Sequence, residues 1–126
     1  MTKYVDTNIL IRLMTNDVPS LAQEAIEQIK IYNSGELLII DAVLVELFFI
    51  LEVNQQYKLP RNKVALIFEG ILSIPQFKLN ENSIAAFNLY SKNKELDFTD
   101  CLLATLGNNE KERVITFDKD LQSILS

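Results

Sequence analysis

The sequence predicts an α/β fold built around a parallel sheet, and three observations favour it. Short apolar runs alternate along the chain with longer segments whose apolar residues recur at helical spacing. Continuous apolar runs are typical of strands buried on both faces of a parallel sheet. The chain has 126 residues, of which 48% are hydrophobic and 23% charged, which is typical of one globular domain. We therefore expect a single domain over residues 1–126.

The first part of the chain predicts a strand, two helices and a second strand. Residues 3–5 form a short strand that leads through a turn into a buried helix over residues 9–14. The next helix begins near Pro19 and ends at the turn formed by residues 33–35. Its apolar face follows the i, i+3, i+4, i+7 spacing and consists of Ala22, Ala25, Ile26 and Ile29. Residues 37–40 predict a fully buried strand.

The remaining chain predicts five more helical segments and two strands. Residues 42–53 form a helix that is apolar almost all round, and Pro60 opens another whose apolar face is Val64, Ile67, Phe68 and Ile71. A weak strand covers residues 77–79. A helix capped by Asn80 follows, with Ile84, Phe87 and Tyr90 on it. Residues 98–106 form a short apolar helix that ends at the C-cap Gly107. Residues 113–117 predict a strand, and residues 118–125 a final helical turn or two.

Missing residue types exclude several kinds of enzyme. The chain has no histidine, which excludes Ser-His-Asp and Cys-His triads and a histidine-bound zinc ion. The single cysteine, Cys101, excludes a disulfide framework and a CxxC pair. The three glycines form no phosphate-binding loop. An enzyme of this composition must work with carboxylates, hydroxyls, amides, Lys and Arg, with or without a bound metal.

Charge and hydropathy narrow the expected partners and location. The chain has 12 basic and 17 acidic residues, a net charge of −5, which argues against a passive nucleic-acid binder. An enzyme that first recruits divalent cations remains compatible with this charge. No apolar run approaches the roughly 20 residues of a membrane span, and the start of the chain lacks the apolar region of a signal peptide. We therefore expect a cytoplasmic protein with no membrane partner.

Two acids directly follow predicted strands. Asp6 comes after the first strand and Asp118 after the last one. Ligands of parallel α/β sheets bind at the carboxyl ends of the strands, so both acids are candidates for a functional site. The alternative interpretation is that each only caps the helix that follows it.

Glu46 is the third candidate because it lies inside the apolar helix over residues 42–53. A charged side chain is rarely buried without a partner, and this helix offers no polar face for it. The alternatives are a buried ion pair, for example with Arg12, and a ligand of a metal at one end of the sheet.

Asp97 and Asp100 open the helix over residues 98–106. Their spacing resembles a capping box, which explains Asp97 better than Asp100. The i, i+3 spacing places both carboxylates on one side of the helix N-terminus.

The acids are more informative together than singly. Two like charges about 4 Å apart repel by about 4 kcal/mol at an effective dielectric constant near 20. A cluster of Asp6, Glu46, Asp100 and Asp118 would therefore need protons or bound cations. Oxygen ligands without His or Cys suit Mg²⁺ or Mn²⁺, and such ions typically serve phosphoryl chemistry.

The order of these motifs resembles the PIN-domain ribonuclease family, and within it the toxins of the VapC type. The motifs are Val5-Asp6-Thr7-Asn8, Val45-Glu46-Leu47, Asp97-Phe98-Thr99-Asp100 and Thr116-Phe117-Asp118. The resemblance implies a three-layer α/β/α fold with a central, mostly parallel sheet. It also implies RNA cleavage that depends on Mg²⁺ or Mn²⁺, a protein antitoxin as partner, and a homodimer.

Carried over residue by residue, the family's acids match Asp6, Glu46, Asp100 and Asp118, with Asp6 and Asp100 as the principal metal ligands. Supporting polar positions match Asn8 and Thr116, and Asp97 is an additional acid near the metal. Two rival functions remain: a catalytically idle binding module, and a phosphatase with an Asp nucleophile. The phosphatase needs a second Asp two residues after the first, where this chain has Asn8.

Overall fold

The structure is a computed structural model that describes residues 2–126, in two compact units. Unit 1 extends to Leu79 and holds the sheet and four helices, and unit 2 is Asn80–Ser126. Over the described residues the chain has seven α-helices and a three-stranded parallel sheet, consistent with the predicted three-layer α/β/α fold. None of these helices is long and apolar enough to cross a membrane.

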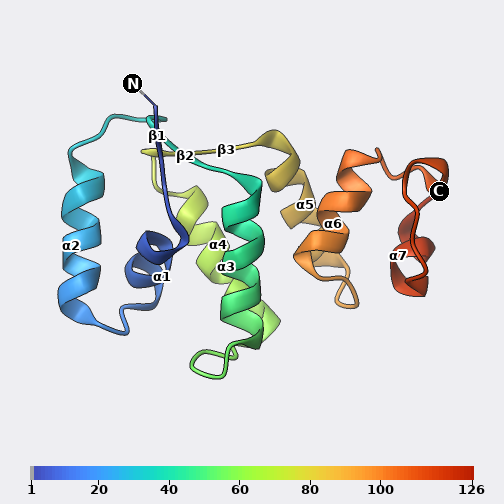
Figure 1. Ribbon diagram of the computed structural model, residues 1–126, viewed down its shortest axis with the longest axis horizontal. Helices are drawn as coiled ribbons and strands as arrows, with labels where there is room; N and C mark the ends of the chain where they lie inside the picture. Colours follow the sequence, from blue (N-terminus) through green and yellow to red (C-terminus); the bar gives the residue numbers. More distant parts are fainter. Residues whose placement is uncertain (1) are drawn as a thin grey trace. The chain divides into compact units, whose positions relative to one another are not determined.

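The sheet of unit 1 consists of β1 (Lys3–Tyr4), β2 (Leu37–Ile39) and β3 (Phe77–Leu79). The strands lie in the order β1-β2-β3 and run parallel, as Figure 1 shows. Lys3 is paired with Leu37, which is paired in turn with Phe77. All three predicted strands of this unit are confirmed. The second strand is less buried than predicted. It ends at Ile39, and Ile40, which the prediction included, is 43% exposed.

The helices of unit 1 begin at the signals that the sequence offers. They are α1 (Thr7–Thr15), α2 (Pro19–Lys30), α3 (Asp41–Val53) and α4 (Arg61–Leu72). Pro19 occupies the first turn of α2, where a backbone N–H would have no hydrogen-bond partner within the helix, so its absence costs nothing. Pro60 is the N-cap of α4. Figure 1 shows α3 and α4 side by side. The ring centroids of Phe48 on α3 and Phe68 on α4 lie 5.4 Å apart, so the two helices are in contact there.

Unit 2 consists of α5 (Glu81–Lys92), α6 (Phe98–Leu106), a 3₁₀ turn (Lys111–Arg113) and α7 (Lys119–Ile124). The predicted caps are confirmed: Asn80 accepts a hydrogen bond from the amide of Asn82, and Gly107 ends α6. Phe87 and Tyr90 on α5 are buried, whereas Ile84 is 38% exposed.

The predicted strand over residues 113–117 is wrong. Arg113 ends the 3₁₀ turn, and Val114–Phe117 belong to no strand pair in the described chain. A strand needs the backbone of a neighbour, and this segment instead bonds locally: the Val114 amide donates to Lys111, and the Thr116 carbonyl accepts from the Gln122 side chain. Strand propensity alone therefore does not make a strand here.

Candidate functional site

Asp6 lies where the sequence predicts it, at the junction between β1 and α1. It is the N-cap of α1, and its Oδ1 accepts a 2.7 Å hydrogen bond from the amide of Thr7. The capping interpretation is thus confirmed. It does not exclude a metal role, because Oδ2 has no hydrogen bond within residues 2–126 and the side chain is exposed.

Glu46 lies in the second turn of α3, the helix that follows β2. The prediction that this helix offers Glu46 no solvated position is wrong, because the residue is exposed. The predicted alternative of an ion pair with Arg12 is also wrong, since Arg12 Nη1 lies 3.0 Å from Asp17 Oδ2 instead. Asp6 directly follows β1, and Glu46 lies in the helix that follows β2. These two strands are parallel neighbours, so their carboxyl ends share one edge of the sheet.

Asn8 lies one residue into α1 from Thr7, on the wall of a groove between α1 and α2. The groove has a volume of about 350 Å³ and also touches Ile9, Arg12, Leu21, Glu24, Ala25 and Gln28. Asn8 is exposed, so its amide is accessible two residues after Asp6. This placement is compatible with the predicted supporting role.

In unit 2, Asp97 and Asp100 meet at the start of α6. Asp97 is the N-cap, and its Oδ1 accepts a 2.8 Å hydrogen bond from the amide of Asp100. Burial and, after it, the negative charges of Asp97 and Asp118 together raise the pKa of the Asp100 carboxyl from 3.8 to about 6. The negative charge of Asp100 is therefore disfavoured at this position.

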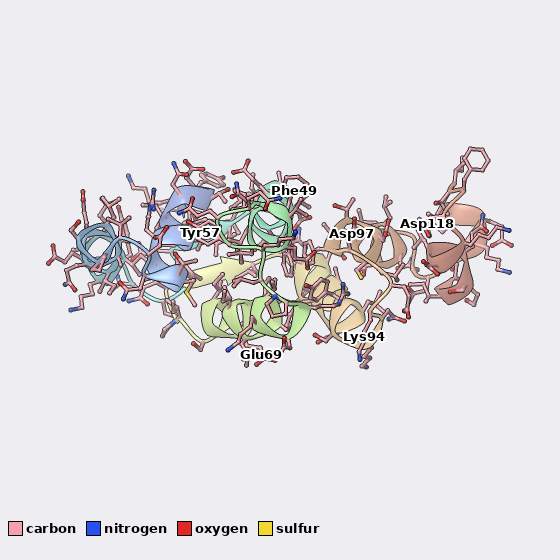
Figure 2. All side chains as sticks on the ribbon, turned by 90° about the horizontal axis from the view of Figure 1, so that it is seen from below. Phe49, Tyr57, Glu69, Lys94, Asp97 and Asp118 are labelled. Carbon is pink, nitrogen blue, oxygen red and sulfur yellow. The ribbon has the colours of Figure 1, made fainter. Side chains whose placement is uncertain are left out.

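Asp118 is the N-cap of α7, although the strand predicted before it does not form. Its Oδ1 accepts hydrogen bonds from the amides of Asp120 at 2.9 Å and Leu121 at 3.2 Å. The amide of Asp118 itself donates to Thr116 Oγ1 at 3.0 Å, so the predicted supporting residue Thr116 touches the predicted ligand. Figure 2 shows Asp97 and Asp118 on the same side of unit 2.

The predicted acids are thus divided between the units: Asp6 and Glu46 belong to unit 1, and Asp97, Asp100 and Asp118 to unit 2. Among residues 2–126 no three acidic or cysteine side chains form a group that could hold a metal ion. The joining of four acids into one site stays a prediction.

The chemistry of these donors fits a hard divalent cation. Every candidate ligand is a carboxylate, the supporting groups are an amide and a hydroxyl, and the single cysteine, Cys101, is buried. Oxygen donors of this kind suit Mg²⁺ and Mn²⁺ better than zinc. A nearby cation would also offset the repulsion that, after burial, raises the pKa of Asp100.

Comparison with known proteins gives one match, to a protein family. No curated protein and no solved structure matches the chain. The sequence model of the PIN domain family matches residues 3–124, which include every acid considered above. With a match that spans both units and nearly all of its length, the chain belongs to the PIN domain family.

Proposed function

We propose that this protein is an endoribonuclease that hydrolyses RNA phosphodiester bonds with Mg²⁺ or Mn²⁺. Membership of the PIN domain family supports nuclease activity in general. The observation that carries the proposal is the position of Asp100 at the start of α6, where burial and, after it, the charges of Asp97 and Asp118 raise its pKa to about 6. Crowded carboxylates of this kind are stabilised when a divalent cation binds to them.

In this proposal Asp6 and Asp100 are the principal ligands, and Glu46 and Asp118 complete the set. A bound divalent ion would polarise the phosphate and stabilise the leaving oxygen. The chain's own task is to present carboxylate oxygens, and the N-cap hydrogen bonds do this by fixing Oδ1 of Asp6 and of Asp118. The chain has no histidine, so among its own residues we assign the uptake of the proton of the attacking water to a carboxylate.

The supporting residues would act on the ligands rather than on the ion. Thr116 binds the backbone of Asp118, Asp97 binds the backbone of Asp100, and Asn8 lies two positions beyond Asp6. These contacts favour a role in orienting the carboxylates, as outer-shell groups do in other metal sites.

The biological setting is part of the same proposal. The motifs resemble VapC-type toxins, so we place the protein in a toxin–antitoxin pair, with RNA as substrate, a protein antitoxin as partner and a homodimer as its assembly. We further propose that both compact units form one nuclease domain, and that it acts in the cytoplasm.

The test is cleavage of single-stranded and structured RNA in the presence of Mg²⁺ or Mn²⁺. Asp6→Asn and Asp100→Asn should each abolish cleavage while the circular dichroism spectrum stays unchanged. Asp120→Asn is the matched control, since this exposed acid of α7 is outside the proposed set. Cleavage by Asp6→Asn would refute the site. An inactive wild-type protein that still captures a protein partner would indicate the idle binding module instead.

A further inference from the structure

Thr7, the residue that follows the proposed metal ligand Asp6, is buried although its side chain is polar. It is 2% exposed, and the only other polar residue buried in the part of the chain that the structure describes is Ser83. Ser83 has an interaction partner, whereas the Thr7 hydroxyl forms no hydrogen bond within residues 2–126. A buried hydroxyl without a partner lowers the stability of the folded state, so packing alone does not explain a threonine here.

The helix itself does not use the Thr7 hydroxyl. Thr15 in α1 and Thr105 in α6 each donate their hydroxyl to the carbonyl four positions back, at 2.7 and 2.8 Å. Thr7 is the first residue of α1, so the carbonyl four positions back belongs to β1 and not to the helix. The N-cap of α1 is already Asp6, whose Oδ1 accepts from the Thr7 amide. Helix geometry therefore gives this hydroxyl no role.

The hydroxyl oxygen belongs to the small part of Thr7 that reaches the surface. In the described chain, no side-chain oxygen or nitrogen of a buried residue is both cut off from solvent and without a hydrogen bond. Because Thr7 Oγ1 has no hydrogen bond, it must lie within the area that this side chain leaves open. The neighbouring residues Asp6 and Asn8 are both exposed. The hydroxyl is thus accessible at the start of α1, where the proposed ligand Asp6 lies.

The rest of the Thr7 side chain is held by packing. Thr7, Leu10 and Ile11 form the buried face of α1 at the spacing i, i+3, i+4, and the two apolar residues are 0% and 7% exposed. A β-branched side chain on such a face has few rotamers. A hydroxyl fixed in this way loses little conformational entropy when it forms a hydrogen bond.

From these features we propose that Thr7 is a positioning residue of the cation site, and that its hydroxyl donates a hydrogen bond to a water molecule that the cation retains beside Asp6. The inference rests on the proposed function, and it adds a residue that is neither one of the acids nor one of the supporting positions. Mg²⁺ is usually held by one or two carboxylates and keeps several of its waters. Groups that hydrogen-bond to the inner ligands orient them and raise the affinity for the metal.

Two substitutions at position 7 separate this role from packing. Valine has nearly the shape of threonine but carries a methyl group in place of the hydroxyl, so Thr7→Val keeps the packing against Leu10 and Ile11 and removes the donor. Thr7→Ser keeps the donor and removes the methyl group. A position that serves only packing needs the shape, whereas a position that holds a water molecule needs the hydroxyl.

The test measures metal binding rather than cleavage. Isothermal titration calorimetry of the whole protein with MnCl₂ gives the affinity for Mn²⁺ in the absence of RNA. We expect Thr7→Val to weaken Mn²⁺ binding by about 10- to 100-fold, the usual loss when a group that orients metal ligands is removed. Thr7→Ser should bind Mn²⁺ as the wild type does. In EDTA, Thr7→Val should melt at or above the melting temperature of the wild type, because it loses no hydrogen bond within the chain.

Thr15→Val is the matched control. It makes the same exchange at the other end of α1, where the threonine hydroxyl donates to the Ile11 carbonyl at 2.7 Å. Because that hydrogen bond is lost, Thr15→Val should lower the melting temperature in EDTA. It should leave the affinity for Mn²⁺ unchanged, so that the two valine variants show opposite patterns.

Unchanged Mn²⁺ affinity in Thr7→Val overturns the inference and leaves the proposed nuclease standing. A lower melting temperature of Thr7→Val in EDTA, or an equal loss of affinity in Thr7→Ser, would assign position 7 to packing and also overturn it. Weaker Mn²⁺ binding in Thr7→Val, combined with no RNA cleavage by the wild type, would reject the nuclease proposal alone. A wild type that binds no Mn²⁺ would reject the cation site and the role of Thr7 together.

Discussion

The phenolic hydroxyl of Tyr57 donates a 2.6 Å hydrogen bond to Asp17 Oδ2, which joins segments 40 positions apart in the sequence. The same oxygen accepts from Arg12 at 3.0 Å and from Gln56 at 3.3 Å. Asp17 lies between α1 and α2, and Tyr57 between α3 and α4. This contact ties the far ends of the two helices that follow β1 and β2, and so helps to fix α1 and α3, which hold Asp6 and Glu46.

Tyr57→Phe tests this contact through its pH dependence. The hydrogen bond from Tyr57 is the largest cause that holds the pKa of Asp17 below its ordinary value of 3.8. A depressed pKa contributes stability that is present above the unfolded value and is lost as the pH falls through the folded value. We expect the variant to melt at a slightly lower temperature at neutral pH, and the difference to shrink below about pH 4.

Thermal melts of wild type and variant across this pH range measure the effect. Tyr32→Phe is the control, because the hydroxyl of this half-buried tyrosine has no hydrogen bond within the described chain. A Tyr57→Phe difference that stays constant down to strong acid would show that the contact with Asp17 carries no stability.

Local signals explain which parts of the fold could be predicted from the sequence. Pro19, Pro60 and Asn80 mark helix starts through their own backbone or side-chain chemistry, and α6 ends at Gly107, as predicted. The prediction of a strand over residues 113–117 was wrong because strand pairing depends on a neighbouring segment that is distant in the sequence, and the segment itself does not specify that neighbour. The exposure of Glu46 and Phe49 was missed because an apolar helix can leave one face in solvent.

For the candidate site, sequence reasoning located each acid and its cap but not how the acids are grouped. Asp6 and Asp118 were recognised from the ends of elements, which are local features. The raised pKa of Asp100 depends on burial and on Asp118, 18 positions away, and no local pattern indicates either. The contact between Asp17 and Tyr57 was missed for the same reason.

Asp97 has two separable roles that a pair of variants distinguishes. Asp97→Ala removes the N-cap of α6 and should destabilise the protein by about 1 kcal/mol. Asp97→Asn keeps a capping oxygen and should cost much less. Both variants remove the negative charge that helps to raise the pKa of Asp100, so that pKa should fall in each. Chemical denaturation gives the stability, and carboxyl NMR titration gives the pKa. Equal destabilisation by Ala and Asn would contradict the capping role.

The pKa of Asp100 predicts how stability depends on pH in the absence of metal. Because the folded value, about 6, exceeds the ordinary 3.8, the folded state holds more protons between these values. Stability contributed by this group is therefore full at low pH, falls as the pH rises through 6, and stays lower above it.

Asp100→Asn should remove this slope and stabilise the metal-free protein at pH 7, by roughly 1 kcal/mol or less because solvent screens a partly exposed group. Denaturation curves of wild type and Asp100→Asn between acid and neutral pH give the difference directly. A variant that is less stable than wild type at pH 7 would show that the carboxylate is not crowded.

Gly107 is predicted to resist substitution because α6 ends against Val114. A Cβ atom at this position would lie 2.8 Å from Val114 Cγ2, so Gly107→Ala should destabilise the protein by about 1–3 kcal/mol. Adding Val114→Ala should restore part of the loss. Gly70→Ala is the matched control, since its Cβ would meet only the flexible end of Met14 at 2.7 Å while the helix gains a better helix former. Equal losses at the two glycines would mean that Val114 yields as easily as Met14.

Mg²⁺ or Mn²⁺ should raise the melting temperature if the acids bind a cation. A ligand that binds only the folded state adds about 2.7 kcal/mol of stability at 100 times its dissociation constant. Matched ionic strength with KCl separates specific binding from general screening of an acidic protein. Asp6→Asn, Asp100→Asn and Asp118→Asn should each reduce the shift, because each removes a ligand. At positions 6 and 118 the Asn side chain can still cap its helix. Asp120→Asn should respond to the metal as the wild type does. Equal shifts with KCl and with Mg²⁺, or full shifts in all three variants, would mean that these carboxylates do not share a cation.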